Sequence, residues 1–155
     1  MSRIKKVLLA AGIVFIAIQF IQPAKNIDNQ VSATDISKTI PVPDNVQALL
    51  KTACYDCHSN NTNYPWYAYI QPAGWLLGSH IAEANGKLNF NEFGNLSARR
   101  QISKLDGIAN SIKDDIMPLT SYKMMHKNAR LTQSEKELLI KWAQQSQDIL
   151  SAQKQ

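Results

Sequence analysis

The sequence has few of the features that mark several common classes of protein. It contains only two cysteines, Cys54 and Cys57, so no second pair is present to complete a four-cysteine zinc site. No segment alternates apolar and polar residues as a half-buried strand does, no hairpin turn is evident, and there is no internal repeat. These absences argue against a β-rich fold, a repeat protein and a zinc module.

An extended basic surface is also lacking. Of the 155 residues, 17 are basic and 12 are acidic, which gives a formal net charge of +5. Four of the basic residues lie within residues 1–26, so the rest of the chain carries 13 basic and 12 acidic side chains. No stripe of basic residues alternates with aromatic ones. We therefore expect no nucleic-acid partner.

Residues 1–26 have the layout of a segment that directs export. Three basic residues precede an apolar run from Val7 to Ile21, which only Gln19 interrupts before Pro23. The run is short of the roughly 20 residues that span a bilayer, yet no A-x-A-like cleavage site follows it. The alternative, a buried helix, would have to be apolar on all faces inside a small domain. We expect a single-pass anchor in the cytoplasmic membrane, with the remaining chain in the periplasm or another extracytoplasmic space. Whether the segment is cleaved stays open.

Beyond this segment, the chain divides into a spacer and one domain. Residues 27–43 show no sustained helical or strand period and end in two prolines, so we expect a flexible polar tether. Residues 44–155 are enough for one small core. Because burial alone stabilises such a core only thinly, a large bound group would contribute much of its folding free energy.

Four segments within residues 44–155 have the spacing of amphipathic helices. We expect the first helix to begin with Asp44 as its cap, and the second to begin near Pro72 and end at Gly86. The third should end at Met117, before Pro118, and the fourth should begin with a capping box of Thr132 and Glu135. No strand pattern competes with them. We therefore predict an all-α domain.

The most informative motif is the C-x-x-C-H pentad of residues 54–58. This sequence is typical of covalent attachment of c-type haem. Two thiols three residues apart on a helical turn can reach two vinyl groups at one edge of the porphyrin, and the next residue can place its imidazole beneath the iron. We predict that Cys54 and Cys57 hold one haem c and that His58 is the proximal iron ligand.

Three other interpretations of the pentad compete with haem attachment. A redox-active C-x-x-C is expected near a βαβ pattern, which this chain lacks. Half of a zinc site would need the histidines to supply the missing ligands. A plain structural disulfide would leave His58 without a role. The pentad, the exported context and the absence of any other cysteine all fit haem better.

A sixth iron ligand has several candidates. Met117 follows a predicted helix 59 residues beyond His58, where a loop can place its sulfur on the second face of the haem. Core packing is the alternative role for a methionine. His80 is the main rival, since it lies on the apolar face of its helix, and the less favoured candidates are His126, Met124 and Met125. We predict Met117, with His80 as the alternative.

The aromatic block of residues 64–69 follows the pentad closely. Large rings with a polar tip can line a haem pocket while they hydrogen-bond to propionates or backbone. Ordinary core packing is an equal alternative for any single ring.

These parts resemble two nested families. The pentad, the Met117-Pro118 turn and the final helix have the order found in class I cytochrome c domains, where a methionine in a late loop completes the iron coordination. Residues 54–90 and 117–143 are more closely similar to small bacterial haem-binding domain proteins, and this similarity extends over most of residues 44–145. The resemblance implies a small cytochrome c-like helical domain around one haem. It includes Met117, His80 and His126, and does not choose among them.

Function follows from the sixth position of the iron. If protein side chains fill both axial positions, no vacancy remains for a substrate, and the protein carries single electrons between redox partner proteins without being an enzyme. If Met117 does not bind, the protein is a haem-based sensor or a peroxidase-like protein. A third possibility is a scaffold that haem only stabilises. The sequence shows no nucleophile or catalytic pair beside the pentad, which favours the electron carrier.

Overall fold

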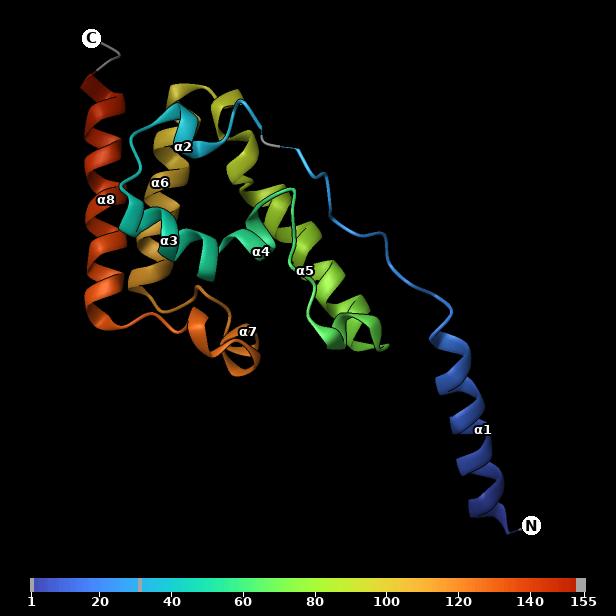
Figure 1. Cartoon of the computed structure of the whole chain (residues 1–155). Coiled ribbons are helices and arrows are strands. Elements are labelled where there is room, and N and C mark those ends of the chain that lie inside the picture. Colours follow the sequence, from blue (N-terminus) through green and yellow to red (C-terminus); the bar gives the residue numbers. More distant parts are fainter. Residues whose placement is uncertain (1, 31, 153–155) are drawn as a thin grey trace.

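The computed structural model describes residues 2–30 and 32–152, and its architecture is helical. Within these residues, the only strand-like pairing is one isolated antiparallel bridge between Ile27 and Asn61. The predicted all-α fold is therefore confirmed for the described part of the chain. The helices enclose one apolar core, and α1 extends away from it (Figure 1).

The elements follow one another along the chain as eight α-helices and three short 3₁₀ helices within the described residues. In order they are α1 (Arg3–Ile18), α2 (Ile36–Thr39), α3 (Asp44–Ala53), α4 (Tyr55–His58), η1 (Trp66–Tyr69), α5 (Ala73–Lys87), η2 (Phe90–Asn95), α6 (Ala98–Lys113), α7 (Thr120–Met125), η3 (Lys127–Ala129) and α8 (Gln133–Ala152).

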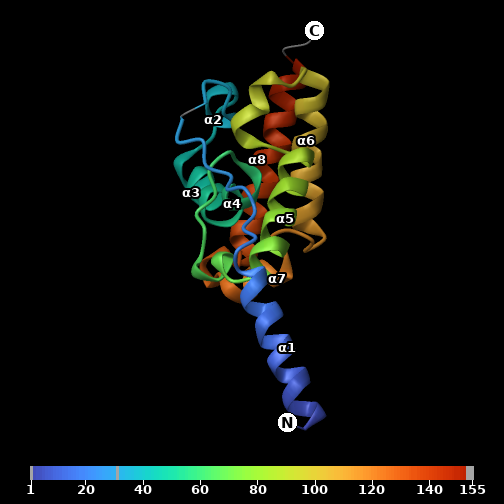
Figure 2. The same ribbon diagram turned by 90° about the vertical axis from the view of Figure 1, so that its right-hand side faces the viewer.

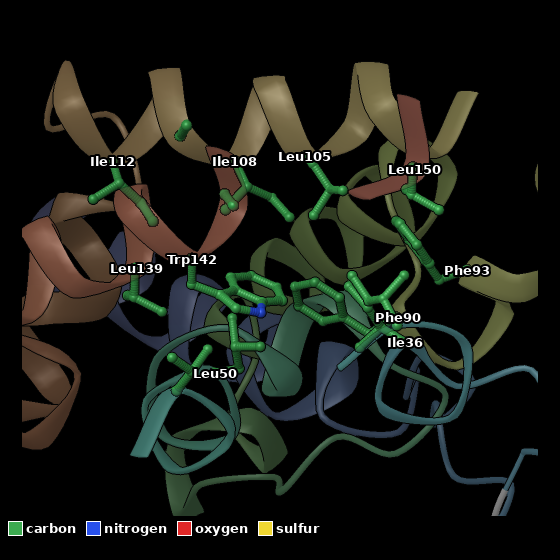
Figure 3. Close-up of a cluster of buried hydrophobic side chains, with 14 residues drawn as sticks. Ile36, Leu50, Phe90, Phe93, Leu105, Ile108, Ile112, Leu139, Trp142 and Leu150 are labelled. Carbon is green, nitrogen blue, oxygen red and sulfur yellow. The ribbon is translucent and has the colours of Figure 1, made fainter. Parts of the chain in front are cut away.

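The core lies where α3 and η2 meet the pair formed by α6 and α8, which run side by side in both views (Figures 1 and 2). Apolar residues at helical spacing on each element meet there, and Figure 3 shows how they interlock around Trp142 and Phe90. The indole nitrogen of Trp142 donates a hydrogen bond to the Pro41 carbonyl at 3.1 Å, so this polar group is satisfied inside the core.

The helix ends match the predictions in part. Thr132 and Glu135 form the expected capping box: the Thr132 backbone NH donates to Glu135 Oε2 at 2.7 Å, and the Glu135 NH donates to Thr132 Oγ1 at 3.3 Å. The start of α3 is also as predicted, but Asp44 is its first residue and makes no capping hydrogen bond. Helix α5 begins at Ala73 and continues through Gly86 to Lys87.

Helix α6 ends earlier than predicted. Its last residue is Lys113 and not Met117, because the chain leaves the helix at Asp114 and Asp115 has a left-handed φ of 60°. The apolar Ile116 that continued the helical pattern in the sequence is instead exposed. Residues 114–119 therefore form a loop that carries Met117, which we call the distal loop.

The membrane-spanning helix predicted at the N-terminus is not found. Helix α1 has 16 residues, which is fewer than the roughly 20 that cross the apolar part of a bilayer. Among the residues that the structure describes, no helix is both long enough and apolar enough to cross a membrane.

The segment expected to be a flexible tether is packed against the domain. Asp35, Ile36 and Ile40 are buried, and Ile36 and Ile40 belong to the core cluster. The side chains of Ser32 and Thr34 both donate to the Asn91 carbonyl, at 2.6 and 2.8 Å. The sequence shows no sustained period here because apolar contacts, such as those of Ile36 and Ile40, alternate irregularly with polar ones. We call residues 26–30 and 32–40 the N-terminal strap.

Candidate haem site

The haem-attachment pentad occupies one short helical turn. Helix α3 ends at Ala53, Cys54 lies at the junction, and α4 follows immediately. The backbone NH groups of Cys57 and His58 both donate to the Cys54 carbonyl, at 3.2 and 2.9 Å. This turn gives both cysteines and the histidine a fixed relation to one another, as the pentad spacing predicts.

His58 is oriented for binding a metal. Its Nδ1 donates a hydrogen bond to the Leu88 carbonyl at 2.9 Å. Since a carbonyl can only accept, Nδ1 carries the proton and Nε2 keeps a free lone pair. The ring also meets the buried Phe90 edge-on, with 6.0 Å between centroids. Burial lowers the pKa of His58 below its ordinary value of 6.5, so the imidazole is neutral at neutral pH.

Cys54 and Cys57 are free thiols and half-buried. Burial, with a smaller effect of the nearby Cys57, raises the pKa of Cys54 to about 12. Burial, with a smaller effect of Asp56, raises the pKa of Cys57 to about 11. Both groups are therefore protonated at neutral pH. Their low thiolate content makes unassisted oxidation slow, which keeps them available for another partner.

The pentad faces a groove made of two adjoining cavities of about 290 Å³ each. Both cavities are lined by Cys54, His58 and Met117, and the second is also lined by Cys57 and His80. The structure thus brings together the two cysteines, the histidine of the pentad and the two favoured candidates for the sixth ligand. The first cavity is otherwise mostly apolar, with walls from η2 and α6. An apolar groove with a free imidazole nitrogen and two thiols fits a haem linked through its vinyl groups.

The candidates for the sixth ligand are separated by their positions. Met117 lines both cavities beside His58, whereas His80 lines only the second of them. Met124 and Met125 are exposed and lie outside both cavities. His126 also lies outside them, and its Nε2 is hydrogen-bonded to the Tyr67 hydroxyl at 2.8 Å. Met117 and His80 remain as candidates.

The distal loop is held at three points. The Met117 NH donates to the Ser111 carbonyl at 3.1 Å, which ties the loop to α6. Lys136 of α8 donates to Asp115 at 2.8 Å. Just after the loop, the Tyr122 hydroxyl of α7 donates to Asp56 Oδ2 at 2.6 Å. The third contact links the distal side directly to the pentad, since Asp56 lies between the two cysteines.

An aromatic network surrounds this third contact. Tyr122 stacks on His126, with 4.1 Å between centroids and 11° between planes, and His126 bonds to Tyr67 from the aromatic block. Burial and the hydrogen bond to Asp56 raise the pKa of Tyr122, so its hydroxyl stays protonated and donates. Sequence reasoning missed Asp56 and Tyr122. Asp56 stands at a variable position of the motif, and 66 residues separate it from Tyr122.

The aromatic block itself is divided in its roles. Tyr67 contacts His126 beside the groove, and Tyr64 accepts a hydrogen bond from the Asn26 NH of the strap at 2.7 Å. Trp66 and Tyr69 point to the surface and are 70% and 49% exposed. The block is therefore only in part a wall of the site.

The alternative of a zinc site finds no support in the geometry. Across residues 2–30 and 32–152, no three His, Cys, Asp or Glu side chains are grouped so that they could hold a metal ion. The imidazole of His58 beside an apolar groove suits haem iron instead.

Comparison with known proteins agrees with this assignment. The family described as haem-binding domain matches residues 13–145, which cover the pentad, the groove and the distal loop. Neither the curated proteins nor the solved structures contain a match to this chain. The resemblance to class I cytochromes c stays a prediction, while haem is supported as the cofactor. From its pentad, its groove and this match over most of its length, the chain belongs to the haem-binding domain family.

Proposed function

We propose that this protein is a c-type haem protein that carries single electrons outside the cytoplasm. The observation that supports it most is the position of His58, whose Nδ1 is bonded to Leu88 while its Nε2 is left for iron, in a groove that Met117 also lines. Two protein ligands in one groove favour a six-coordinate iron, and such an iron changes oxidation state without binding a substrate.

Cys54 and Cys57 would attach the cofactor. Each S–H adds across the C=C bond of one haem vinyl group: sulfur bonds to one carbon, the proton goes to the other, and no electrons are gained or lost. Because both thiols are protonated in the fold at neutral pH, the addition needs a catalyst or a chain that is still open. Such attachment takes place outside the cytoplasm, in keeping with the export-like residues 1–26.

His58 and Met117 would set the reduction potential. A buried neutral imidazole with its other nitrogen bonded to a carbonyl is a fixed and basic ligand. A thioether as the sixth ligand favours ferrous iron and raises the potential relative to two imidazoles. The protein would then suit electron exchange with redox partner proteins of moderately positive potential.

A second candidate function rests on the location of Met117. It lies in a loop outside any helix and is half-buried, while His80 lines the same second cavity. If the distal loop leaves the iron, His80 would stand beside an open position, as a haem-based sensor or a peroxidase-like protein requires.

We also propose that the N-terminal region places the protein at the cytoplasmic membrane. Helix α1 has no buried residue, although most of its side chains are apolar. A helix of this kind is stabilised when lipid replaces water around it.

Visible spectroscopy of the purified holoprotein, matured in a host that attaches haem c, tests the proposal. We expect haem that stays with the chain in acidic acetone, a low-spin spectrum in both oxidation states, and a weak long-wavelength sulfur-to-iron band when oxidised. Carbon monoxide should bind the reduced protein slowly or not at all. Rapid, complete binding to wild-type protein would support the sensor or peroxidase-like function, and extractable haem would refute covalent attachment.

A further inference from the structure

The end of α1 is firmly joined to the haem domain. Reciprocal hydrogen bonds link Gln19 and Gln71: the Gln71 NH donates to Gln19 Oε1 at 2.8 Å, and Gln19 Nε2 donates to the Gln71 carbonyl at 3.3 Å. The side chain of Gln71 is fully buried and donates to Gln22 Oε1 at 2.9 Å. Three glutamines thus fix the exit of α1 against the start of α5.

Two further contacts strengthen this junction. The indole nitrogen of Trp75 donates to the Ile21 carbonyl at 2.7 Å. The ammonium of Lys25 lies 4.1 Å from the ring centroid of Tyr69, a cation–π distance. Residues 19–25 therefore act as a rigid connection. The environment that binds α1 therefore also determines how the haem domain is oriented.

Large apolar and aromatic side chains are exposed around this junction. Contiguous exposed apolar surface is uncommon on soluble monomers, and here it comes from both sides of the junction. We call these residues the collar: Phe20, Ile21, Trp66, Tyr69, Ile70, Trp75 and Leu76. Both ribbon views show α1 leaving the domain at the end where α5 begins (Figures 1 and 2).

The chemistry of the collar matches that of a membrane–water interface. Tryptophan and tyrosine concentrate at the level of the lipid headgroups, where one end of the ring is apolar and the other is wet. Lys25 places a positive charge among these rings, where lipid phosphates would lie. Exposed apolar side chains also follow α1 from Ile4 to Ile16. A protein partner would have to cover both surfaces at once, whereas a lipid layer does so naturally.

We propose that the collar lies in the headgroup layer of a lipid membrane, so that the haem domain is held against the surface in one orientation. This proposal rests on the proposed membrane association of the N-terminal region and deepens it. It replaces the picture of a domain that turns freely on a tether. The haem groove then faces partners from a fixed direction.

The test uses full-length holoprotein reconstituted into vesicles of phosphatidylcholine and phosphatidylglycerol. A small fraction of the lipid carries a photoreactive group next to the headgroup, and mass spectrometry locates the labelled residues. We expect label within residues 66–76 as well as in the N-terminal region, and none on α8. Label confined to the N-terminal region would overturn the collar proposal while leaving membrane association intact. A protein that does not enter vesicles at all would overturn both.

A variant pair gives a second measurement. Trp66→Ser combined with Ile70→Ser should lower the vesicle partition coefficient by about tenfold, because two exposed apolar side chains lose their contact with lipid. Ile149→Ser is the matched control, since Ile149 is as exposed as Ile70 but lies on α8. Equal effects of the two changes would contradict the proposal. Two results together would contradict the proposal and assign the surface to a second copy of the chain. The collar would carry no label, and the protein would form a dimer that the Trp66 and Ile70 changes dissociate but the Ile149 change does not.

Discussion

The two sides of the haem groove are held in different ways. His58 lies on a helical turn, bonds to the backbone of Leu88 and packs against the buried Phe90. Met117 lies in the distal loop, whose ties beyond α6 are the side-chain contacts of Asp115 and Tyr122. The proximal side is thus connected to the core, whereas the distal side combines backbone bonds to the end of α6 with these side-chain contacts. We expect changes on the proximal side to affect assembly and changes on the distal side to adjust reactivity.

Removal of the proximal ligand should have the largest effect. His58→Ala deletes the imidazole and leaves the Leu88 carbonyl without its donor. We expect almost no low-spin haem and a sharply reduced yield of holoprotein, measured by visible absorption against protein concentration. Cys54→Ala or Cys57→Ala should leave a single thioether link and a smaller loss of yield. A low-spin His58→Ala protein at wild-type yield would contradict the assignment of the proximal ligand.

Removal of the distal ligand should leave assembly intact and open the iron. Met117→Ala should keep covalent haem, lose the long-wavelength band and convert the reduced protein from resistance to complete binding of carbon monoxide. Met117→His should stay low-spin at a lower potential, since imidazole favours ferrous iron less than a thioether does. His80→Ala is the control and should keep the band. A different outcome would identify His58 and His80 as the two ligands: the wild type would lack the band, and the His80→Ala variant would be high-spin.

The contact between Tyr122 and Asp56 allows a finer comparison. Tyr122→Phe keeps the stacking on His126 but removes the hydrogen bond to the carboxylate of Asp56 in the pentad, a loss of about 1.5 to 3 kcal/mol. We expect the long-wavelength band to disappear at a lower temperature than in the wild type, while covalent haem is retained. The measurement is the band intensity during heating.

Tyr55→Phe is the matched control for this change. Tyr55 lies in the same pentad, but its hydroxyl donates to Asp35 of the strap at 3.2 Å, away from the distal loop. Tyr55→Phe should lower the temperature midpoint of global unfolding, but the long-wavelength band should persist until the protein unfolds. If both variants behave alike, Tyr122 has no specific role in holding the distal loop.

The contact between Asp115 and Lys136 should have the smallest effect. Asn tolerates the left-handed backbone at position 115, so Asp115→Asn removes charge without adding strain. We expect a shift in the midpoint of band loss that is smaller than that of Tyr122→Phe and that vanishes at high salt. A shift that salt leaves unchanged would mean that the residue acts through backbone geometry.

The same contact gives a pH dependence. The hydrogen bond from Lys136, with the charge of Lys123 nearby, lowers the pKa of Asp115 below its ordinary value of 3.8. The carboxylate therefore supports the loop above that value, and its contribution is lost as the pH falls through the lowered pKa. Between neutral pH and about 4, this contact should not weaken.

The sequence predicted the features that rest on local pattern. The pentad singled out Cys54, Cys57 and His58, which the structure places together beside the groove, and Thr132 with Glu135 marked the start of α8. Features that depend on distant or backbone partners were not predictable. The carbonyl of Leu88 that orients His58 has no sequence signature, since every residue has a carbonyl.

The end of α6 shows a different limit. Its apolar spacing continues to Ile116, but the left-handed turn at Asp115 and the contact with Lys136 decide where the helix stops. The strap was missed for a related reason. Part of its order comes from polar contacts to distant loops, such as that of Asn26 to Ser59, 33 residues away, and that of Ser32 to Asn91, 59 residues away.

The strap has a consequence for the order of events during synthesis. It is made first, but its partners Ser59 and Asn91 are made later, so it cannot close until the chain has been made as far as Asn91. Asn26 bonds to the carbonyl of Ser59, directly after the pentad. The strap can therefore close only after the pentad has been made, and its closure holds the segment that directly follows His58.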